Sequence, residues 1–545
     1  MEVGALAVCE TVVFCQTCRA PYCSEELARV VPYRCRFGYN VIEYVGRALF
    51  LRGCSEQQVQ QELSAHNISA SLNQVGYLGR KFIAYLALVH KESGNAIREH
   101  LARQGGYILH VDATCEGDSP FVMSGLDEIS NTVLHNVKIP SENTQDIVPF
   151  LQEIVAANGT PLAVISDMSG AIAAAVSEVL PGVAHYICHF HFLRDIGKDL
   201  LEASYDTIRR TLRSLKTRAQ LRALAKTCRV KIEQSSELTD ALTQYATEHT
   251  NGLPSQTLPG CVLAYTLVLW VLCAPKTATG KGFPFDRPHL LLYERLLSVH
   301  NLFLQKTTLH TKSPALERLK SISREIVHNH ALERAASSLH EKIAVFDRLR
   351  HAMRIALPGS KTSLNDDGKS ASFKTIKKAL SEFRADLELN EKAKTSRAYE
   401  KMFKQIDASW KKLFADPLTV TTQQGSKIIY PQRTNNILER FFRSLKRTFR
   451  RKTGNHSLTR ILRAMLADTP LVQNILNPEW MRIVLKGKSS LAERFADLDP
   501  HSVRQYLHQL KDLSHQRVPN KLKRLLRISD LADKLAVNPN SRLAA

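Results

Sequence analysis

Hydrophobic positions recur at helical spacing along residues 37–95 of this 545-residue chain. The spacing predicts three helices, over 40–52, 56–65 and 71–90. The second begins with Ser55-Glu-Gln-Gln, a capping-box pattern, and Val59 and Leu63 fall on one face of it. Two helices joined by a tight turn are compatible with a helix-turn-helix that binds DNA, and also with an ordinary helical hairpin.

The third of these helices has a clear start and a basic end. The stretch Ser69-Ala70-Ser71 is expected to supply its N-cap, and Leu72, Val75 and Leu78 are expected to face inward. Near its far end stand the candidate DNA contacts Arg80 and Lys81.

Residues 101–200 change to strand periodicity after the Gly105-Gly106 break. Strands are expected over 107–112, 120–125, 132–139, 161–166 and 183–188, with helices over 143–157 and 168–180. The order therefore begins with hairpins and continues with βαβ crossovers. Ribonuclease-H-like domains have this order of elements.

From about 201 to 425 the pattern is almost wholly helical. The apolar run Cys261–Cys273 is expected to be a core helix, because it is shorter than the roughly 20 residues of a membrane span. A polar stretch at 358–368 is expected to be an exposed loop. The end, from about 476 to 545, is expected to be helical and basic and to close in a polar tail.

Charge is distributed unevenly along the chain. The total is 74 Lys and Arg against 52 Asp and Glu, a formal net charge of +22, yet residues 101–200 hold 4 basic and 12 acidic side chains. Because acidic patches repel phosphates unless a cation intervenes, an acidic island in a basic chain fits a metal-dependent enzyme that acts on nucleic acid. Chance segregation of charge between two domains would give the same distribution.

The remaining composition excludes several classes of protein. Eleven cysteines are too sparse for a disulfide scaffold in a chain of this length. The first ten residues carry Glu2 where a secretory signal would have Lys or Arg. We therefore expect a cytoplasmic protein that neither is secreted nor enters a membrane.

Two aspartates stand at the ends of predicted strands. Asp112 ends the first strand and Asp167 the fourth, and ligands of open sheets gather beyond the carboxyl ends of strands. If these strands are neighbours, the two carboxylates converge on one point. Carboxylates bind hard cations such as Mg²⁺, and two such ions about 3.5–4 Å apart can drive phosphodiester cleavage. The alternative for Asp167 is a role as the N-cap of the next helix.

A basic helix is predicted to start near Thr434, which could cap it. Its apolar stripe comprises Leu438, Phe441, Phe442, Leu445 and Phe449. Between Arg433 and Arg460 there are nine Lys and Arg, and Glu439 is the only acid. Glu439 could pair with Arg443 at the surface, or it could face a metal while its basic neighbours bind flanking phosphates. These candidate DNA contacts are Arg440, Arg443, Lys446, Arg447 and Arg450.

Four motifs in this order resemble the bacterial DDE transposases of the Mutator-like (MULE) type. They are His110-Val-Asp112-Ala-Thr, Ile165-Ser-Asp167, Cys188-His-Phe-His191 and Thr434-Asn-Asn-Ile-Leu-Glu439-Arg. The resemblance covers about 100–200 and 430–455. It implies an α/β ribonuclease-H-like catalytic core interrupted by a large all-α insertion, after an N-terminal helix-turn-helix-like domain, in a multidomain chain that is mostly α overall.

The resemblance also implies the roles of the site residues. Asp112, Asp167 and Glu439 would hold two Mg²⁺ or Mn²⁺ ions, and His191 would act near the active site. Cys188 would complete the family's Cys-x-x-His signature, although a buried cysteine after a strand is usually only packed. Partners would be the element's terminal repeats and target DNA, with self-association on paired ends and a location at the nucleoid.

Five cysteines precede residue 36, and Cys15-x-x-Cys18 has the spacing of a zinc knuckle. Cys23 and Cys35 could complete four ligands for a structural Zn²⁺, but there is no second Cys-x-x-Cys, and Cys9 makes the choice ambiguous. Free thiols in a reducing cytosol are the alternative.

The expected organisation follows from these elements together. It is a cysteine-containing segment over 1–36, for which a partial zinc ribbon is one interpretation; a helix-turn-helix-like DNA-binding domain over 37–95; the first part of the catalytic core over 100–200; an all-helical insertion over 201–425; the closing helix of the core with Glu439 over 426–475; and a basic helical region over 476–545. The expected function is that of an insertion-sequence transposase. The alternatives are a transposase-derived DNA-binding regulator without catalysis and a structure-selective nuclease with the same metal site.

Overall fold

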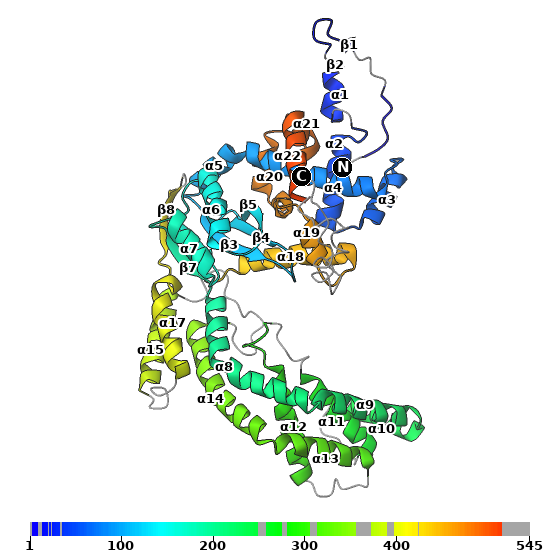
Figure 1. Ribbon diagram of the computed structural model, residues 1–545, viewed down its shortest axis with the longest axis vertical. Helices are drawn as coiled ribbons and strands as arrows, with labels where there is room; N and C mark the ends of the chain where they lie inside the picture. The colour runs from blue at the N-terminus through cyan, green and yellow to red at the C-terminus, as the bar shows by residue number, and fades with distance from the viewer. Residues whose placement is uncertain are drawn as a thin grey trace, which may run out of the picture. The chain divides into compact units, whose positions relative to one another are not determined.

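The computed structural model describes residues 3–8, 13–19, 21–22, 24–32, 35–248, 258–274, 281–305, 313–355, 372–389, 397–422 and 425–514. Over these residues the chain is mostly helical, with one mixed five-stranded sheet and two small two-stranded sheets (Figure 1). It divides into unit 1, formed by Met1–His185, Thr419–Lys427 and Asn435–Ala545, and unit 2, formed by Tyr186–Leu418 and Ile428–Thr434. The expected loop at 358–368 and the polar tail lie outside the described residues.

Unit 1 begins with a short hairpin and a run of helices. These elements are β1 (Val13–Phe14), β2 (Pro21–Tyr22), α1 (Glu25–Val30), α2 (Tyr39–Arg47), the π-helix η1 (Ala48–Arg52), α3 (Glu56–Ala65), α4 (Leu72–Glu92) and α5 (Gly94–Arg103). Ser55 caps α3 in a complete capping box, as the sequence predicts, and Ser71 of the expected capping stretch caps α4, also in a complete capping box. Asn67, between α3 and α4, has a φ of 59°, a left-handed conformation that asparagine tolerates better than most residues.

Most of the residues that were expected on the inner faces of α3 and α4 are buried. The expectation that Val59, Leu63, Val75 and Leu78 face inward is confirmed, since all four are buried. The same expectation is wrong for Leu72, which is 44% exposed at the start of α4, where Ser71 and Asn73 are exposed as well.

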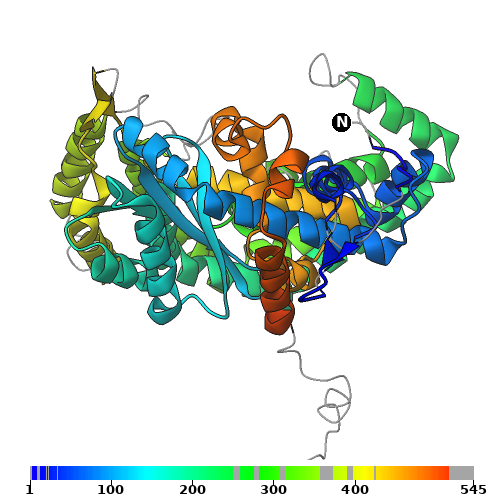
Figure 2. The same cartoon turned by 90° about the horizontal axis from the view of Figure 1, so that it is seen from above.

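The sheet of unit 1 has the strand order β5-β4-β3-β6-β7. Its strands are β3 (Ile108–Thr114), β4 (Phe121–Asp127), β5 (Thr132–Ile139), β6 (Ala163–Ser166) and β7 (Ala184–Ile187). β3 pairs antiparallel with β4 and β4 antiparallel with β5, whereas β3 and β6 are parallel. The crossover from β5 to β6 runs through α6 (Thr144–Asn158), and α7 (Gly170–Val179) links β6 to β7. In Figure 2 both helices lie beside the strands, and α6 contacts both β5 and α7.

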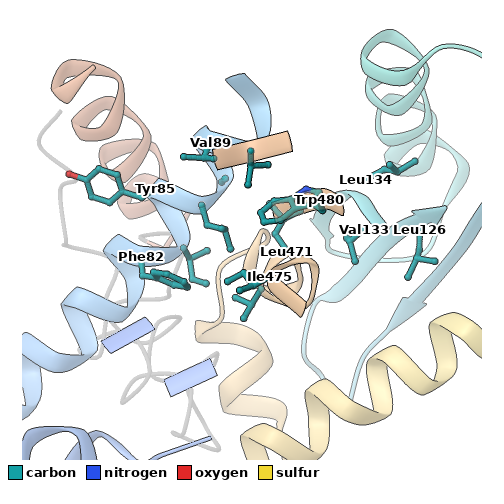
Figure 3. Packing of buried hydrophobic residues seen from close by; sticks show 14 of the residues in the cluster. Phe82, Tyr85, Val89, Leu126, Val133, Leu134, Leu471, Ile475 and Trp480 are labelled. Atoms are coloured by element: carbon teal, nitrogen blue, oxygen red, sulfur yellow. The ribbon is translucent and has the colours of Figure 1, made fainter. Parts of the chain in front are cut away.

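The last segment of unit 1 returns to this sheet. It consists of α18 (Asn436–Thr453), α19 (Thr459–Ala464), the 3₁₀ helix η4 (Thr469–Leu476), α20 (Pro478–Leu485), α21 (Leu491–Ala496) and α22 (Pro500–Ser514). Figure 3 shows side chains of α4, β4, β5, η4 and α20 packed together. One core cluster therefore joins the N-terminal helices, the sheet and the C-terminal helices.

Unit 2 is a set of helices. They are α8 (His189–Ser214), α9 (Thr217–Glu233), α10 (Ser236–Glu248), α11 (Gly260–Leu272), α12 (Pro288–Gln305), α13 (Pro314–Val327), α14 (His330–Met353), α15 (Phe373–Glu388) and α17 (Arg397–Leu413). Helix α11 corresponds to the expected core helix, although Leu269 and Trp270 on it are exposed. No described helix of the chain is both long enough and apolar enough to cross a bilayer.

Three boundaries differ from those predicted. The all-helical pattern ends before 425, because β8 (Leu418–Thr422) and β9 (Gly425–Ile429) form a hairpin there. Helix α18 starts at Asn436 with Asn435 as its N-cap residue, so Thr434 does not cap it. Ser169, rather than Asp167, is the N-cap of α7, and its hydroxyl accepts a hydrogen bond from the Ile172 amide.

Candidate functional site

The two candidate aspartates lie at one edge of the sheet of unit 1. β3 and β6 are adjacent and parallel, with His110 paired to Ile165. Asp112 and Asp167 each come two residues after this pair, so they occupy equivalent positions along neighbouring strands. This adjacency is the condition under which the sequence predicts that the two carboxylates converge.

Local hydrogen bonds orient both carboxylates. Asp112 Oδ1 accepts from the Ala113 amide at 2.8 Å, and Asp167 Oδ1 accepts from the Ser169 amide at 2.9 Å. Both side chains are partly buried. Asp167 thus supports the turn into α7 without being its N-cap, and the two roles considered for this residue are compatible.

Asn435 holds the start of α18 against β3. Its Nδ2 donates to the Val111 carbonyl at 3.1 Å, and its Oδ1 lies 2.8 Å from His110 Nδ1. Asn435 is fully buried, and its own carbonyl accepts from the Glu439 amide at 3.2 Å. A segment more than 300 residues away in sequence is therefore attached one residue before Asp112, with Glu439 one helical turn beyond the attachment.

His110 extends this attachment to the far end of the next strand. Its Nε2 lies 3.0 Å from Glu128 Oε2, and the exposed fractions of the two side chains are 0% and 8%. Both ring nitrogens of His110 therefore face oxygen atoms, one from Asn435 and one from Glu128. A buried polar network whose members have partners fixes the relative positions of the elements that carry them, here β3 and α18.

The electrostatics of Asp112 show that several acids surround it. Burial raises the pKa of Asp112 well above its usual range, and the negative charges of Asp167, Glu439 and Glu142 raise it further, against a lowering by the Ala113 amide. Glu439 of α18 is partly buried, and Glu142 lies in the loop between β5 and α6. The two other predicted acids thus lie within electrostatic range of Asp112, together with Glu142, which the sequence did not single out.

The donor chemistry of this acid cluster fits a hard divalent cation. Carboxylate oxygens are the ligands that Mg²⁺ prefers, and a cation would offset the repulsion that raises the pKa of Asp112. Within the described residues, however, no group of three or more His, Cys, Asp or Glu side chains has the arrangement of a formed metal site.

Helix α18 presents its basic residues as the apolar stripe predicts. Leu438, Phe441, Phe442, Leu445 and Phe449 are all buried, which confirms the expected inner face. Arg440, Arg443, Arg447 and Arg450 are exposed on the remaining surface. Among the described residues, Arg443 and Arg447 form no hydrogen bond or ion pair, so the alternative pairing of Glu439 with Arg443 is not present in this structure.

Two other basic residues of α18 are engaged by the loop that follows β3. Lys446 Nζ donates to the Cys115 carbonyl at 3.4 Å, and Arg450 forms a 3.0 Å salt bridge with Glu116. Glu116 also accepts from the Leu458 amide at 2.9 Å, and these contacts lower its pKa. The loop that follows β3 therefore forms a second attachment to α18. This attachment lies after Glu439 along the helix, whereas the attachment through Asn435 lies before it.

The two candidate DNA contacts of α4 differ in exposure. Arg80 is exposed and, with Glu56 and Lys452, lines a cavity of about 220 Å³ between the N-terminal helices and α18. Lys81 is only 6% exposed, and its Nζ lies 2.7 Å from Cys35 Sγ. The expectation that Lys81 contacts DNA is at odds with this burial, because one position along a helix rotates a side chain by about 100°.

Cys188 and His191 belong to unit 2, at the start of α8. Cys188 is the buried N-cap residue of the helix, and His191 lies in its first turn. Their neighbour His189 is held more tightly: its amide donates to the Arg433 carbonyl, and its Nε2 lies 2.5 Å from the Leu413 carbonyl. Burial and the charge of Arg433 lower the pKa of His189 to about 3, so its ring is neutral at physiological pH.

The Cys15-x-x-Cys18 pair forms the turn between β1 and β2. The Arg19 amide donates to the Cys15 carbonyl at 2.9 Å, and the amides of Cys18 and Thr17 help to lower the pKa of Cys15 to about 7. Cys35 lies beside Lys81 instead, while Cys9 and Cys23 lie outside the described residues. Zinc binding here stays a prediction.

Sequence reasoning missed four residues of this site. Asn435 and His110 stand inside the quoted motifs without a role, and only the tertiary contact shows that they pair. Glu128 and Glu142 lie in the turns before and after β5, where an acid is usually a solvated turn residue. The available signal was the high density of acids in 101–200, which does not distinguish one acid from another.

Comparison with known proteins adds no assignment: a scan against protein-family models and a search of curated proteins both returned no match for this chain.

Proposed function

We propose that this chain is a transposase of an insertion element, with a ribonuclease-H-like catalytic core in unit 1. It would cleave a phosphodiester at the end of the element and join the freed 3′-hydroxyl to target DNA. The observation that carries the proposal is the position of Asp112 and Asp167 at equivalent points of adjacent parallel strands, with Glu439 within electrostatic range.

The strand arrangement supports this assignment. An antiparallel β3-β4-β5 meander followed by a parallel crossover to β6 is the order expected for a ribonuclease-H-like core. Function cannot follow from a fold alone, because one fold hosts many chemistries. The acid cluster at the carboxyl end of β3 and β6 is what makes phosphodiester chemistry the best-supported choice.

The side chains of this site would have three different roles: metal binding, positioning of α18 and phosphate binding. Asp112, Asp167 and Glu439 would hold two divalent cations, which when bound supply the activation of the attacking oxygen and the stabilisation of the leaving one. Asn435 and His110 hold α18 against β3, so that Glu439 stays beside Asp112. The exposed Arg443 and Arg447 would contact phosphates that flank the scissile bond.

The direct test is a nicking assay on DNA that carries the element's ends, with Mg²⁺ or Mn²⁺ present. Asp112→Asn, Asp167→Ala and Glu439→Gln are each expected to abolish nicking while DNA binding in EDTA persists. The matched control is Glu178→Gln, which removes an exposed acid of α7 outside the cluster and is expected to leave nicking unchanged. Equal nicking by wild type and Asp167→Ala would refute the assignment of the acids.

The same assay separates the two alternatives. A DNA-binding regulator without catalysis would bind the ends and nick nothing, whatever cation is added. A structure-selective nuclease would nick in the same metal-dependent way but would not join the cut strand to a second DNA. Strand joining that is lost in Glu439→Gln is therefore the result that identifies a transposase.

A further inference from the structure

Unit 2 contains a basic cavity that the proposed active site does not use. It has a volume of about 490 Å³ and lies between α8, α9 and α12. Its polar lining consists of Arg209, Arg213, Lys216, Arg218, Arg222 and His289. The other lining residues are apolar, including Leu212 and Leu292, so none of the described residues places an acidic side chain in the lining.

The positive charge of this cavity is largely uncompensated. Arg209 pairs with Asp206 at 2.9 Å, outside the lining. The side chains of Arg213, Lys216, Arg218 and Arg222 form no hydrogen bond or ion pair with any residue that the structure describes. Like charges held together without counterions repel, so an arrangement of this kind is favourable only when an anion enters it.

Two further features point the same way. The cavity lies at the N-terminus of α9, a 17-residue helix that has no acid in its first turn and no side-chain cap. The positive end of the helix dipole therefore adds to the arginines. Arg209, which lines the cavity, has a buried Nε without a hydrogen-bond partner among the described residues, and so has the buried hydroxyl of Thr217, the first residue of α9.

Three of the arginines also act together on His289, a residue that lines the cavity. His289 on α12 has its pKa lowered first by burial and then by the charges of Arg218, Arg209 and Arg213. Its Nδ1 lies 2.9 Å from the Tyr205 hydroxyl, which holds the ring in place. The positive charges of three arginines from α8 and α9 thus act on the same side chain of α12, which is His289.

We propose that this cavity binds the phosphodiester backbone of nucleic acid, as a second contact surface located in unit 2. The lining distinguishes a backbone from a small phosphorylated ligand. The lining has positively charged side chains but no carboxylate, amide or large aromatic side chain that could recognise a base or a sugar. The cavity can therefore recognise only the negative charge of the phosphates. Arg213, Lys216 and Arg222 are exposed at its mouth, where a long polyanion can reach them.

The inference goes beyond the proposed function and does not depend on it, because backbone binding needs none of the three acids. The test uses the full chain and a fluorescent DNA duplex of unrelated sequence, with anisotropy measured in EDTA at several salt concentrations. Arg213→Ala/Arg222→Ala is expected to weaken binding at least tenfold at low salt. Since each lost phosphate contact changes the salt slope by about 0.9, the slope should become shallower by about 1 to 2.

Two controls make the result specific. Lys374→Ala/Lys377→Ala removes two exposed positive charges from α15 of the same unit, and it is expected to change affinity and slope much less. Arg213→Lys/Arg222→Lys keeps the charge and is expected to retain most of the binding. All three variants change exposed side chains, and circular dichroism checks that each is folded.

Three results would overturn the inference. One is an unchanged affinity and slope in Arg213→Ala/Arg222→Ala; another is an equal loss in the α15 variant, which would make the effect one of net charge. The third is calorimetric binding of pyrophosphate that the double variant loses while duplex binding stays intact, which would assign the cavity to a small phosphate ligand. A failure of the nicking assay leaves all of these measurements interpretable, because they are made without divalent cations.

Discussion

Asn435 is the residue on which the candidate active site depends most directly. It joins α18 to β3 through hydrogen bonds to His110 and to the Val111 carbonyl, all of them buried. Removing one partner of a buried hydrogen bond costs more than the bond itself contributes, since the remaining group loses its water without gaining a partner.

Asn435→Ala is therefore expected to lower the stability of unit 1 by about 1–3 kcal/mol. Urea unfolding followed by circular dichroism measures this change as a lower midpoint. Asn455→Ala is the matched control, because Asn455 is an exposed asparagine just after α18 and its loss should change stability by less than about 0.5 kcal/mol. Equal midpoints for the two variants would mean that Asn435 does not anchor the helix.

His90 links stability to pH. Burial lowers the pKa of His90 to about 4, and its ring lies between the Leu134 carbonyl and Trp480 Nε1. Because the unfolded chain takes up a proton near pH 6.5 while the folded chain does not, this contribution to stability is present above pH 6.5 and is lost as the pH falls toward 4.

Between pH 6.5 and 4, the free energy of unfolding is expected to fall by on the order of 2 kcal/mol because of His90. His90→Gln should flatten the fall of the unfolding midpoint over this range, whereas His456→Gln, at an exposed histidine of the same unit, should not. Thermal unfolding at several pH values measures the difference. A profile of His90→Gln parallel to that of wild type would show that His90 does not contribute.

At the scale of elements, α18 combines two functions on its two faces. Its apolar stripe packs into unit 1, and the opposite face exposes arginines that have no partner among the described residues at positions 443 and 447. The 3.6-residue periodicity of the sequence is enough to assign residues to the two faces. Only the apolar face makes tertiary contacts.

Arg443→Ala/Arg447→Ala is expected to weaken DNA association and to reduce its salt dependence by about 1 to 2 in slope. Titration of the full chain against duplex DNA at several salt concentrations measures both effects. Lys452→Ala provides a contrast, since Lys452 is mostly covered, lies over the Phe50 ring and faces Glu56. An unchanged slope in the arginine variant would mean that α18 does not touch DNA.

At the scale of the whole molecule, unit 1 is built from distant parts of the chain around one core. Helix α4, strands β4 and β5, η4 and α20 all contribute buried side chains to it (Figure 3). The segment 37–95, expected as a DNA-binding domain, is thus continuous with the core of the sheet. Its helices are expected to unfold together with the sheet, because shared burial couples them.

Trp480→Ala tests this coupling. Trp480 is 2% exposed, and its truncation is expected to cost about 3–5 kcal/mol. Amide hydrogen exchange should become faster in both α4 and β5, while α9 and α11 of unit 2 keep their protection. Faster exchange confined to α20 and η4 would show that the N-terminal helices and the sheet are separately stable.

Most element positions could be predicted from the sequence, because they depend on local periodicity and capping. The capping box at Ser55, the N-cap of α4, strand β5 and the stripe of α18 were all expected and are present. The failures lie where tertiary packing decides: Leu72 is exposed, Lys81 is buried, and the β8–β9 hairpin begins inside the region that was expected to be helical up to about 425.

By itself, the sequence determined which side chains could do chemistry and where along the elements they stand. The amphipathic period of α18 and the strand-end positions of Asp112 and Asp167 are local properties, readable from neighbouring residues. Only the tertiary structure decided which of the twelve acids in 101–200 surround Asp112, and that Asn435 attaches α18 beside them. The reason is that contacts across more than 300 residues depend on strand order and buried hydrogen bonds, which leave no periodic trace in the chain.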